Sequence, residues 1–220
     1  MALSNASKAG VALFVGSVQF GIALVLAEIY YPGYNVSTNY VSDLGATCPT
    51  SGPCVINQPT STIFNSSIVL LGLLVVVGAY FLQRAFQWKP ASILTALAGI
   101  GAMGVGLFPE TTGIWHSVFS LTVFLFAGLS ALVTARFQRK PMFYFSIILG
   151  LFTLASLVLY VGDDYLGLGP GGMERMVVYP VLLWAIGFGG HLMAQGSAPL
   201  GVGARDPESQ SESGLSLPSA

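Results

Sequence analysis

The sequence predicts an all-α, multi-pass membrane protein, and three observations lead to that fold class. Only 8% of the 220 residues are charged, 54% are hydrophobic, and the mean hydropathy is +0.74. Soluble domains carry about 25% charged residues, so most of this surface must face lipid. Six apolar runs are long enough to cross a bilayer as helices. They lack the strict alternation of barrel strands, so we expect a six-helix bundle.

The six predicted transmembrane helices form one domain over residues 1–195. The first helix is too long, and its start too weakly basic, for a cleaved signal peptide. The third is the shortest because Pro109 ends it. The predicted spans are 9–30, 62–83, 91–108, 113–135, 142–161 and 176–194. Residues 196–220 are rich in Ser, Gly and Pro, which predicts a disordered cytoplasmic tail.

The distribution of Lys and Arg predicts which helix ends face the cytoplasm. Seven of the eight basic residues lie before the first helix, after the second or fourth helix, or in the tail, and Arg175 alone lies on the other side. Cytoplasmic loops carry the excess of Lys and Arg, so both termini are predicted to be cytoplasmic, in a cell membrane. Loops 31–61, 109–112 and 162–175 are then extracytoplasmic. Every acidic residue before the tail lies at or beyond the extracytoplasmic end of a helix.

Two cysteines bracket the segment CPTSGPC in the first extracytoplasmic loop. Outside the cytoplasm, Cys48 and Cys54, with turn-forming Pro and Gly between them, favour a disulfide. Two free thiols or a metal-binding pair are the alternatives, but no further Cys or nearby His supports a metal. A disulfide here would hold the loop rather than perform redox chemistry.

Polar side chains at the extracytoplasmic helix ends are the candidate ligand-binding residues. Ionisable groups in membrane segments are costly and often functional, although Glu28 beside Tyr30 also fits a solvated interfacial position. His116 fits either an interfacial histidine or an inward-facing proton acceptor. Asp163 and Asp164 fit either a cation site or a solvated turn. The candidates are Glu28, Asn39, Ser42, Asp43, Asn65, Glu110, His116, Asp163, Asp164, Glu174 and Arg175.

We expect these groups to surround a polar extracytoplasmic pocket, with the loop YPGYNVSTNYVSDLG (31–45) folded over it. The cytoplasmic helix ends carry basic residues and Gln but no acid, so the polar character is specific to one side. The two histidines lie on opposite sides of the membrane, which excludes a three-histidine zinc site. No metal or cofactor is identified by the sequence.

Four segments carry a family likeness over about residues 10–194. YPGYNVSTNYVSDLG, IFNSSIVLLG, GVGLFPE with a following WHS, and GMERMVVYPVLLW resemble the membrane family catalogued as domain of unknown function 998. A weaker likeness connects the chain to the Frag/DRAM/Sfk group of six-helix membrane proteins, whose eukaryotic members are linked to GPI-lipid remodelling and autophagy. That likeness implies matching positions at Ser42, Asp43 and His116 and a lipid-related role. The CPTSGPC insert and the M-E-R turn depart from that pattern.

Three functions remain open from the sequence. The first is a protein that binds or remodels a lipid headgroup at the outer leaflet, with Arg175 holding an anionic group. The second is a small transporter or ion-binding protein, although coupling sites usually lie near the midplane, where helices two to six carry no acid. The third is a non-enzymatic subunit or assembly factor that meets a membrane-protein partner through the Gly-rich faces GIGAMGVG and GFGG.

The sequence contains no motif that establishes an enzyme. No nucleophile elbow, HExxH or P-loop is present. A Ser42–His116–Asp43 catalytic arrangement can be drawn, but nothing in the sequence fixes its geometry. The net charge of −1 offers no basic surface for nucleic acid.

Overall fold

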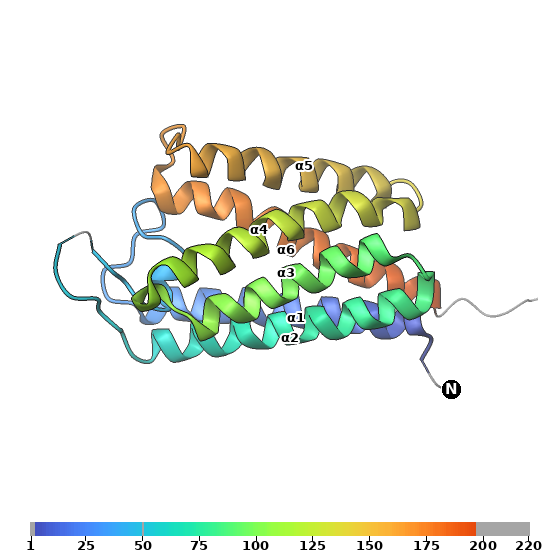
Figure 1. Cartoon of the computed structure of the whole chain (residues 1–220), viewed down its shortest axis with the longest axis horizontal. Helices are drawn as coiled ribbons and strands as arrows, with labels where there is room; N and C mark the ends of the chain where they lie inside the picture. Colours follow the sequence, from blue (N-terminus) through green and yellow to red (C-terminus); the bar gives the residue numbers. More distant parts are fainter. Residues whose placement is uncertain (1–2, 50, 197–220) are drawn as a thin grey trace, which may run out of the picture.

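The computed structural model describes residues 3–49 and 51–196, and it confirms the all-helical fold class. Six long helices pack side by side in one bundle (Figure 1). They are α1 Asn5–Tyr30, α2 Thr60–Phe86, α3 Lys89–Leu107, α4 Ile114–Thr134, α5 Met142–Val161 and α6 Gly169–Gly196. Short 3-10 turns lie between them, at η1 Ser42–Leu44, η2 Glu110–Thr112 and η3 Ala135–Phe137. The predicted tail from residue 197 onward lies outside the described residues.

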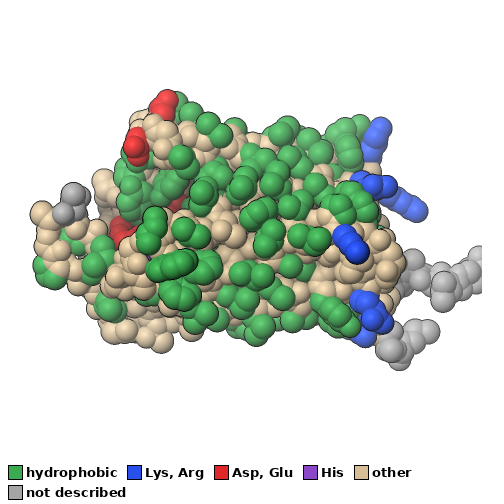
Figure 2. Space-filling model, viewed as in Figure 1, with side chains coloured by type: hydrophobic (Ala, Val, Ile, Leu, Met, Phe, Trp, Pro, Cys, Tyr) green, Lys and Arg blue, Asp and Glu red, His purple; other side chains and the backbone are tan. Residues whose placement is uncertain are grey.

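Among the described residues, six helices are long and apolar enough to cross a membrane. Hydrophobic side chains cover the middle of the bundle, while Lys and Arg gather at one end and Asp and Glu at the other (Figure 2). We call these the basic end and the acidic end. The acidic end comprises the end of α1, the long loop 31–59, the start of α4 and the α5–α6 turn (Figure 1). This distribution is typical of a multi-pass membrane protein.

The start of α6 differs from the prediction. The helix begins at Gly169, seven residues before the expected start at 176, so 169–175 is helix rather than loop. The glycines of this segment lower its helix propensity, which favours a loop when the sequence is read alone. However, Pro170 has the φ angle that a first helical turn needs and no N–H to leave unpaired. Glu174 and Arg175 therefore lie on a helix, where adjacent residues point in different directions.

Glycines bring several helices into close contact. A Cβ on Gly72 in α2 would lie 2.5 Å from the carbonyl oxygen of Gly99 in α3, and one on Gly101 would lie 2.6 Å from the main-chain nitrogen of Val123 in α4. In the second Gly-rich segment, a Cβ on Gly189 would lie 2.7 Å from the carbonyl oxygen of Gly10 in α1. These glycines pack helix against helix within the chain, as small residues do in lipid.

Candidate functional site

The long loop 31–59 folds back over the acidic end of the bundle. Its first half is shaped by its own asparagines: Asn35 Oδ1 accepts hydrogen bonds from the N–H groups of Ser37 and Thr38. Asn39 donates from Nδ2 to Asp43 Oδ2, at 3.0 Å. The N–H groups of Gly171 and Gly172, in the first turn of α6, donate to the carbonyl oxygen of Ser37. The loop is therefore held by α6 as well as by its own polar groups.

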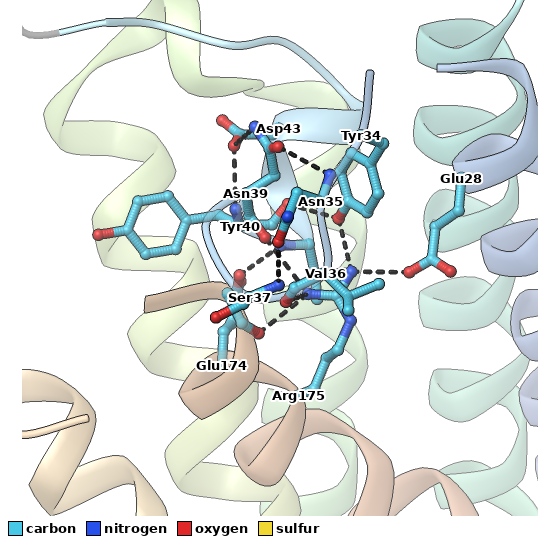
Figure 3. Close-up of polar contacts among 12 residues, drawn as sticks. Glu28, Tyr34, Asn35, Val36, Ser37, Asn39, Tyr40, Asp43, Glu174 and Arg175 are labelled. Carbon is cyan, nitrogen blue, oxygen red and sulfur yellow. Dashed lines mark hydrogen bonds and ion pairs between the residues drawn. The ribbon is translucent and has the colours of Figure 1, made fainter. Parts of the chain in front are cut away.

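Arg175 is the centre of the contacts that hold the loop (Figure 3). Its side chain projects from the second turn of α6, and the residue is only 5% exposed. Nη1 donates to the main-chain oxygens of Val36 at 3.0 Å, Asn39 at 3.3 Å and Gly171 at 2.9 Å. Unpaired donors on a buried guanidinium are costly, and although Nε has no hydrogen-bond partner, Nη1 binds loop and helix to one another.

The other terminal nitrogen of Arg175 connects the loop to α1. Nη2 forms an ion pair with Glu28 at 2.7 Å and donates to the Tyr34 hydroxyl at 2.6 Å. Tyr34 in turn donates to the carbonyl oxygen of Tyr40 at 2.8 Å. Burial raises the pKa of the Tyr34 hydroxyl, so this phenol stays protonated and available as a donor. Arg175 is thus paired within the protein and leaves no terminal nitrogen directed at a ligand.

A cavity of about 660 Å³ lies beneath the loop. Its roof is formed by loop residues 38–49, and its walls by η2, the first turns of α4, the last turn of α5 and Glu174 of α6. Five of the predicted site residues line it: Ser42, Asp43, Glu110, His116 and Glu174. This brings together side chains that are up to 132 positions apart in the sequence, from Ser42 to Glu174.

The polar lining of the cavity is acidic. Glu110 accepts hydrogen bonds from the Ser42 hydroxyl at 2.6 Å and from the Cys48 N–H at 3.3 Å. Asp43 accepts through Oδ2 from Asn39 and from the Tyr40 N–H. The described residues that line the cavity include no Lys or Arg, so the carboxyl groups face it without a cationic partner.

Glu174 is the most deeply placed of the three acids. The residue is 4% exposed, and its Oε2 accepts a hydrogen bond from the N–H of Val41. Among the described residues, no hydrogen-bond donor contacts its other oxygen. Its neighbour Arg175 is paired with Glu28 on a different side of the helix. Glu174 therefore presents a largely uncompensated carboxyl group to the cavity.

Burial shifts the ionisation of the two acids that lie outside the membrane-spanning helices. It raises the pKa of Asp43, against the opposing effect of the hydrogen bonds from Asn39 and Tyr40. It also raises the pKa of Glu110, and the nearby charge of Asp43 acts in the same direction. The charge of Asp43 thus hinders the ionisation of Glu110, as expected where negative charge gathers without a counter-ion.

His116 forms part of the wall near the start of α4. Its Nδ1 lies 2.9 Å from the carbonyl oxygen of Phe108, and its Nε2 lies 3.3 Å from the Ser120 hydroxyl. The carbonyl can only accept, so Nδ1 carries the proton, and in the neutral imidazole Nε2 accepts from the Ser120 hydroxyl. The histidine is therefore buried and oriented, not a wet interfacial side chain.

The Ser42–His116–Asp43 arrangement considered from the sequence does not form. Ser42 donates to Glu110 rather than to His116, and Asp43 is engaged by Asn39 and Tyr40. Adjacent loop residues point into different parts of the site, so no relay of proton transfer joins these three side chains. Among the described residues, no three His, Cys, Asp or Glu side chains are placed to hold one metal ion.

Three other candidates lie away from the cavity. Asn65, in α2, donates to the carbonyl oxygen of Gly45 at 3.3 Å and to the Ser61 hydroxyl at 3.1 Å, and so supports the loop from below. Asp163 and Asp164 lie in the exposed α5–α6 turn, where they accept from the Tyr165 hydroxyl and the Leu166 N–H. This is the solvated turn that the sequence left as one alternative.

Cys48 and Cys54 form the predicted disulfide. It closes the far end of the loop next to an antiparallel bridge between Thr47 and Val55, whose N–H and C=O groups pair in both directions. Cys48 also lines the cavity and donates its N–H to Glu110. The disulfide therefore fixes a stretch of backbone that contributes directly to the cavity wall.

A smaller cavity of about 100 Å³ lies deeper in the bundle and has a largely apolar lining. Its lining includes Ser17 and Trp184, whose Oγ and Nε1 atoms are buried without a hydrogen-bond partner. The two cavities share four lining residues, Ser42, Ser120, Phe124 and Glu174. Glu174 thus lies at the boundary between a polar outer space and an apolar inner one.

Aromatic residues of the cavity were missed by the sequence-based selection. Tyr40 and Tyr160 meet edge to face with ring centroids 6.1 Å apart, and Phe124 lies edge to face against Tyr160 at 6.3 Å. All three line the cavity. Tyr160 near the end of an apolar helix looks like an ordinary interfacial anchor, and only the tyrosine-rich composition of loop 31–45 hinted at an aromatic site.

The fold and the cavity can be compared with known proteins. The model of a family described as "Protein of unknown function (DUF998)" matches residues 14–191, which is most of the chain. The chain belongs to the DUF998 family. The matched region of this DUF998 protein runs from α1 to α6 and contains the loop and the cavity. No curated protein and no solved structure matches the chain. This DUF998 protein is an integral membrane protein whose activity has to be argued from the site itself.

Proposed function

We propose that this protein binds a lipid headgroup in the cavity at its acidic end, and that this end faces away from the cytoplasm. The single observation that supports the proposal most is the two-sided lining of the cavity. Its roof carries Asp43 and its wall Glu110, whereas its lower part is formed by Leu121, Phe124 and Leu157. A headgroup with the start of its acyl chains has the same division into polar and apolar parts.

The position of the cavity supports entry from the bilayer. Leu121 in α4 and Val161 in α5 line the cavity, yet they are 49% and 65% exposed. Each residue therefore belongs both to the cavity wall and to the outer surface of the bundle. A lipid in the surrounding leaflet could pass between the outer parts of these two helices without leaving the membrane. The volume of about 660 Å³ lies within the range of small-molecule sites, about 300–1,000 Å³.

The proposed orientation in the membrane is inferred from the basic residues at the basic end. Lys and Arg gather there, as the positive-inside rule requires of a cytoplasmic side (Figure 2). The disulfide at the acidic end agrees with an oxidising compartment. Arg175 has no part in holding an anionic group, because its terminal nitrogens are taken up by Glu28, Tyr34 and main-chain oxygens.

Native mass spectrometry of the protein released from lipid nanodiscs tests this proposal. Ser117 and its neighbour Val118 are both exposed, but only Ser117 lines the cavity. We expect wild type and Val118→Trp to retain a bound lipid, and Ser117→Trp to lose it because the indole takes space in the cavity that the headgroup needs. Equal lipid retention in the two variants, or no retained lipid in wild type, would overturn the proposal.

A further inference from the structure

We infer that the headgroup held in this cavity carries an ammonium group, as in an ethanolamine or choline headgroup. This inference rests on the proposed lipid-binding function and names the chemistry of its ligand. It starts from the charges that face the cavity. Asp43, Glu110 and Glu174 supply three carboxyl groups, and the described lining residues supply no Lys or Arg to balance them.

The second carboxylate oxygen of Glu174 indicates which chemical group the ligand supplies. Glu174 is 96% buried and uses one carboxylate oxygen for the Val41 N–H, and the other has no hydrogen-bond partner among the described residues. A buried carboxylate without a cationic partner is costly, and a cation in the cavity would reduce that cost. The guanidinium of the neighbouring Arg175 is already paired with Glu28 at 2.7 Å.

The arrangement of the acids fits an organic cation better than a metal ion. The carboxyl groups come from separate walls, with Asp43 in the loop, Glu110 in η2 and Glu174 in α6. Among the described residues, no three such groups converge on one point as metal ligands do. A primary ammonium group has three N–H donors that can reach separate walls, and a trimethylammonium group is wide enough to contact several walls at once, so neither needs the convergent ligands of a metal ion.

The aromatic residues of the cavity add to this fit. Tyr40, Tyr160 and Phe124 line it in two edge-to-face pairs. Aromatic faces attract ammonium groups through the ring quadrupole, and cages of such rings recognise substituted ammonium ligands. Carboxylates and aromatic rings together are the groups that an ammonium ligand prefers.

The remaining wall suits the phosphate of the same headgroup. The first turn of α4 lines the cavity through Gly113, His116 and Ser117, and no side chain caps this turn. The free N–H groups at a helix start favour an anion. The cavity thus offers separate positions for the positive and the negative part of a zwitterionic headgroup.

Lipid competition in nanodiscs tests the inference. Phosphatidylethanolamine and phosphatidylcholine are compared with phosphatidylglycerol, which has no ammonium group, by native mass spectrometry. We expect wild type to prefer the ammonium lipids by about tenfold or more, because charge-assisted contacts distinguish them. Glu174→Gln keeps an oxygen for the Val41 N–H but loses the charge, and it should remove most of this preference, as should Glu110→Gln. Asp163→Asn removes an exposed acid from the same end and should leave the preference unchanged.

Each outcome separates the inference from the proposed function. Wild type could retain phosphatidylglycerol as well as or better than the ammonium lipids, and Ser117→Trp could lose it. That result would overturn the ammonium inference and leave lipid binding intact. If Ser117→Trp loses no bound lipid relative to wild type, the lipid proposal is overturned. In that case, binding of free ethanolamine or choline that depends on Glu174 would support an ammonium ligand from solution, and its absence would overturn the inference too. A preference unaffected by Glu174→Gln and Glu110→Gln would also count against it.

Discussion

Replacing Arg175 with Met should release the long loop from the bundle. Arg175 is 5% exposed and its guanidinium holds Glu28 at 2.7 Å, so the replacement leaves that acid without its partner. Breaking a buried ion pair costs about 3–5 kcal/mol. The Glu28 side chain is 20% exposed and can regain some water, so we take about 3 kcal/mol, the low end of that range. At 1.36 kcal/mol for each factor of ten, local opening becomes about 150-fold more frequent.

Hydrogen exchange of the loop amides measures this opening directly. The Val41 N–H is bonded to Glu174 and should exchange about 150-fold faster in Arg175→Met, since it is freed whenever the loop lifts. Arg84 is exposed at the basic end, so Arg84→Met is a matched control and should leave the rate unchanged. The Glu28→Gln, Arg175→Met double variant should recover part of the protection, because no unpaired charge remains. A change of less than about threefold in Arg175→Met would refute the reasoning, which requires about two orders of magnitude.

Three further expectations concern the backbone and the charges around the cavity. Gly171→Ala should weaken the loop contact and lower the melting temperature, because a Cβ there would overlap the Asn39 carbonyl oxygen, whereas Gly190→Ala on the same helix meets open space and should not. Burial raises the pKa of Glu110, so its favourable contribution to stability is complete below its unfolded pKa and is lost as pH rises through the folded pKa. The stability of Glu110→Gln relative to wild type should therefore be greater at about pH 8 than at about pH 4, measured by chemical unfolding in micelles. Replacing both cysteines with Ser should cost about 2 kcal/mol in the same assay and abolish the effect of reductant, because the disulfide closes a short loop.

The helices could be predicted because lipid imposes a simple requirement on the chain. A span needs about 20 apolar residues whatever its neighbours are, so length and composition identify all six helices. The start of α6 could not be predicted in this way. The N–H groups of Gly171 and Gly172, in the first turn of this helix, donate to the carbonyl oxygen of Ser37, and this supporting contact is invisible in the local sequence.

Part of the site could be predicted because the spans also determine at which end of the bundle each polar residue lies. The gathering of acids at one end follows from their positions relative to the spans, and these positions alone assign Asp43, Glu110 and Glu174 to the same side of the membrane. Which acids share a cavity depends on the bundle packing, and so Asp163 and Asp164 could not be separated from them. The role of Arg175 depends on a contact with Glu28 across 147 positions, which no local pattern encodes.

The way Arg175 holds the loop has a consequence for how the sequence can drift over evolution. Three of its five acceptors are main-chain oxygens, those of Val36, Asn39 and Gly171, and a main-chain oxygen is present whatever side chain the residue bears. Position 36 can therefore be substituted freely while the loop keeps its path. Glu28 and Arg175 have no such freedom, since each must change together with the other. Relatives with very different loops should thus be aligned on this pair of charges, and the shape of the loop inferred from the pair rather than from the similarity of the loop itself.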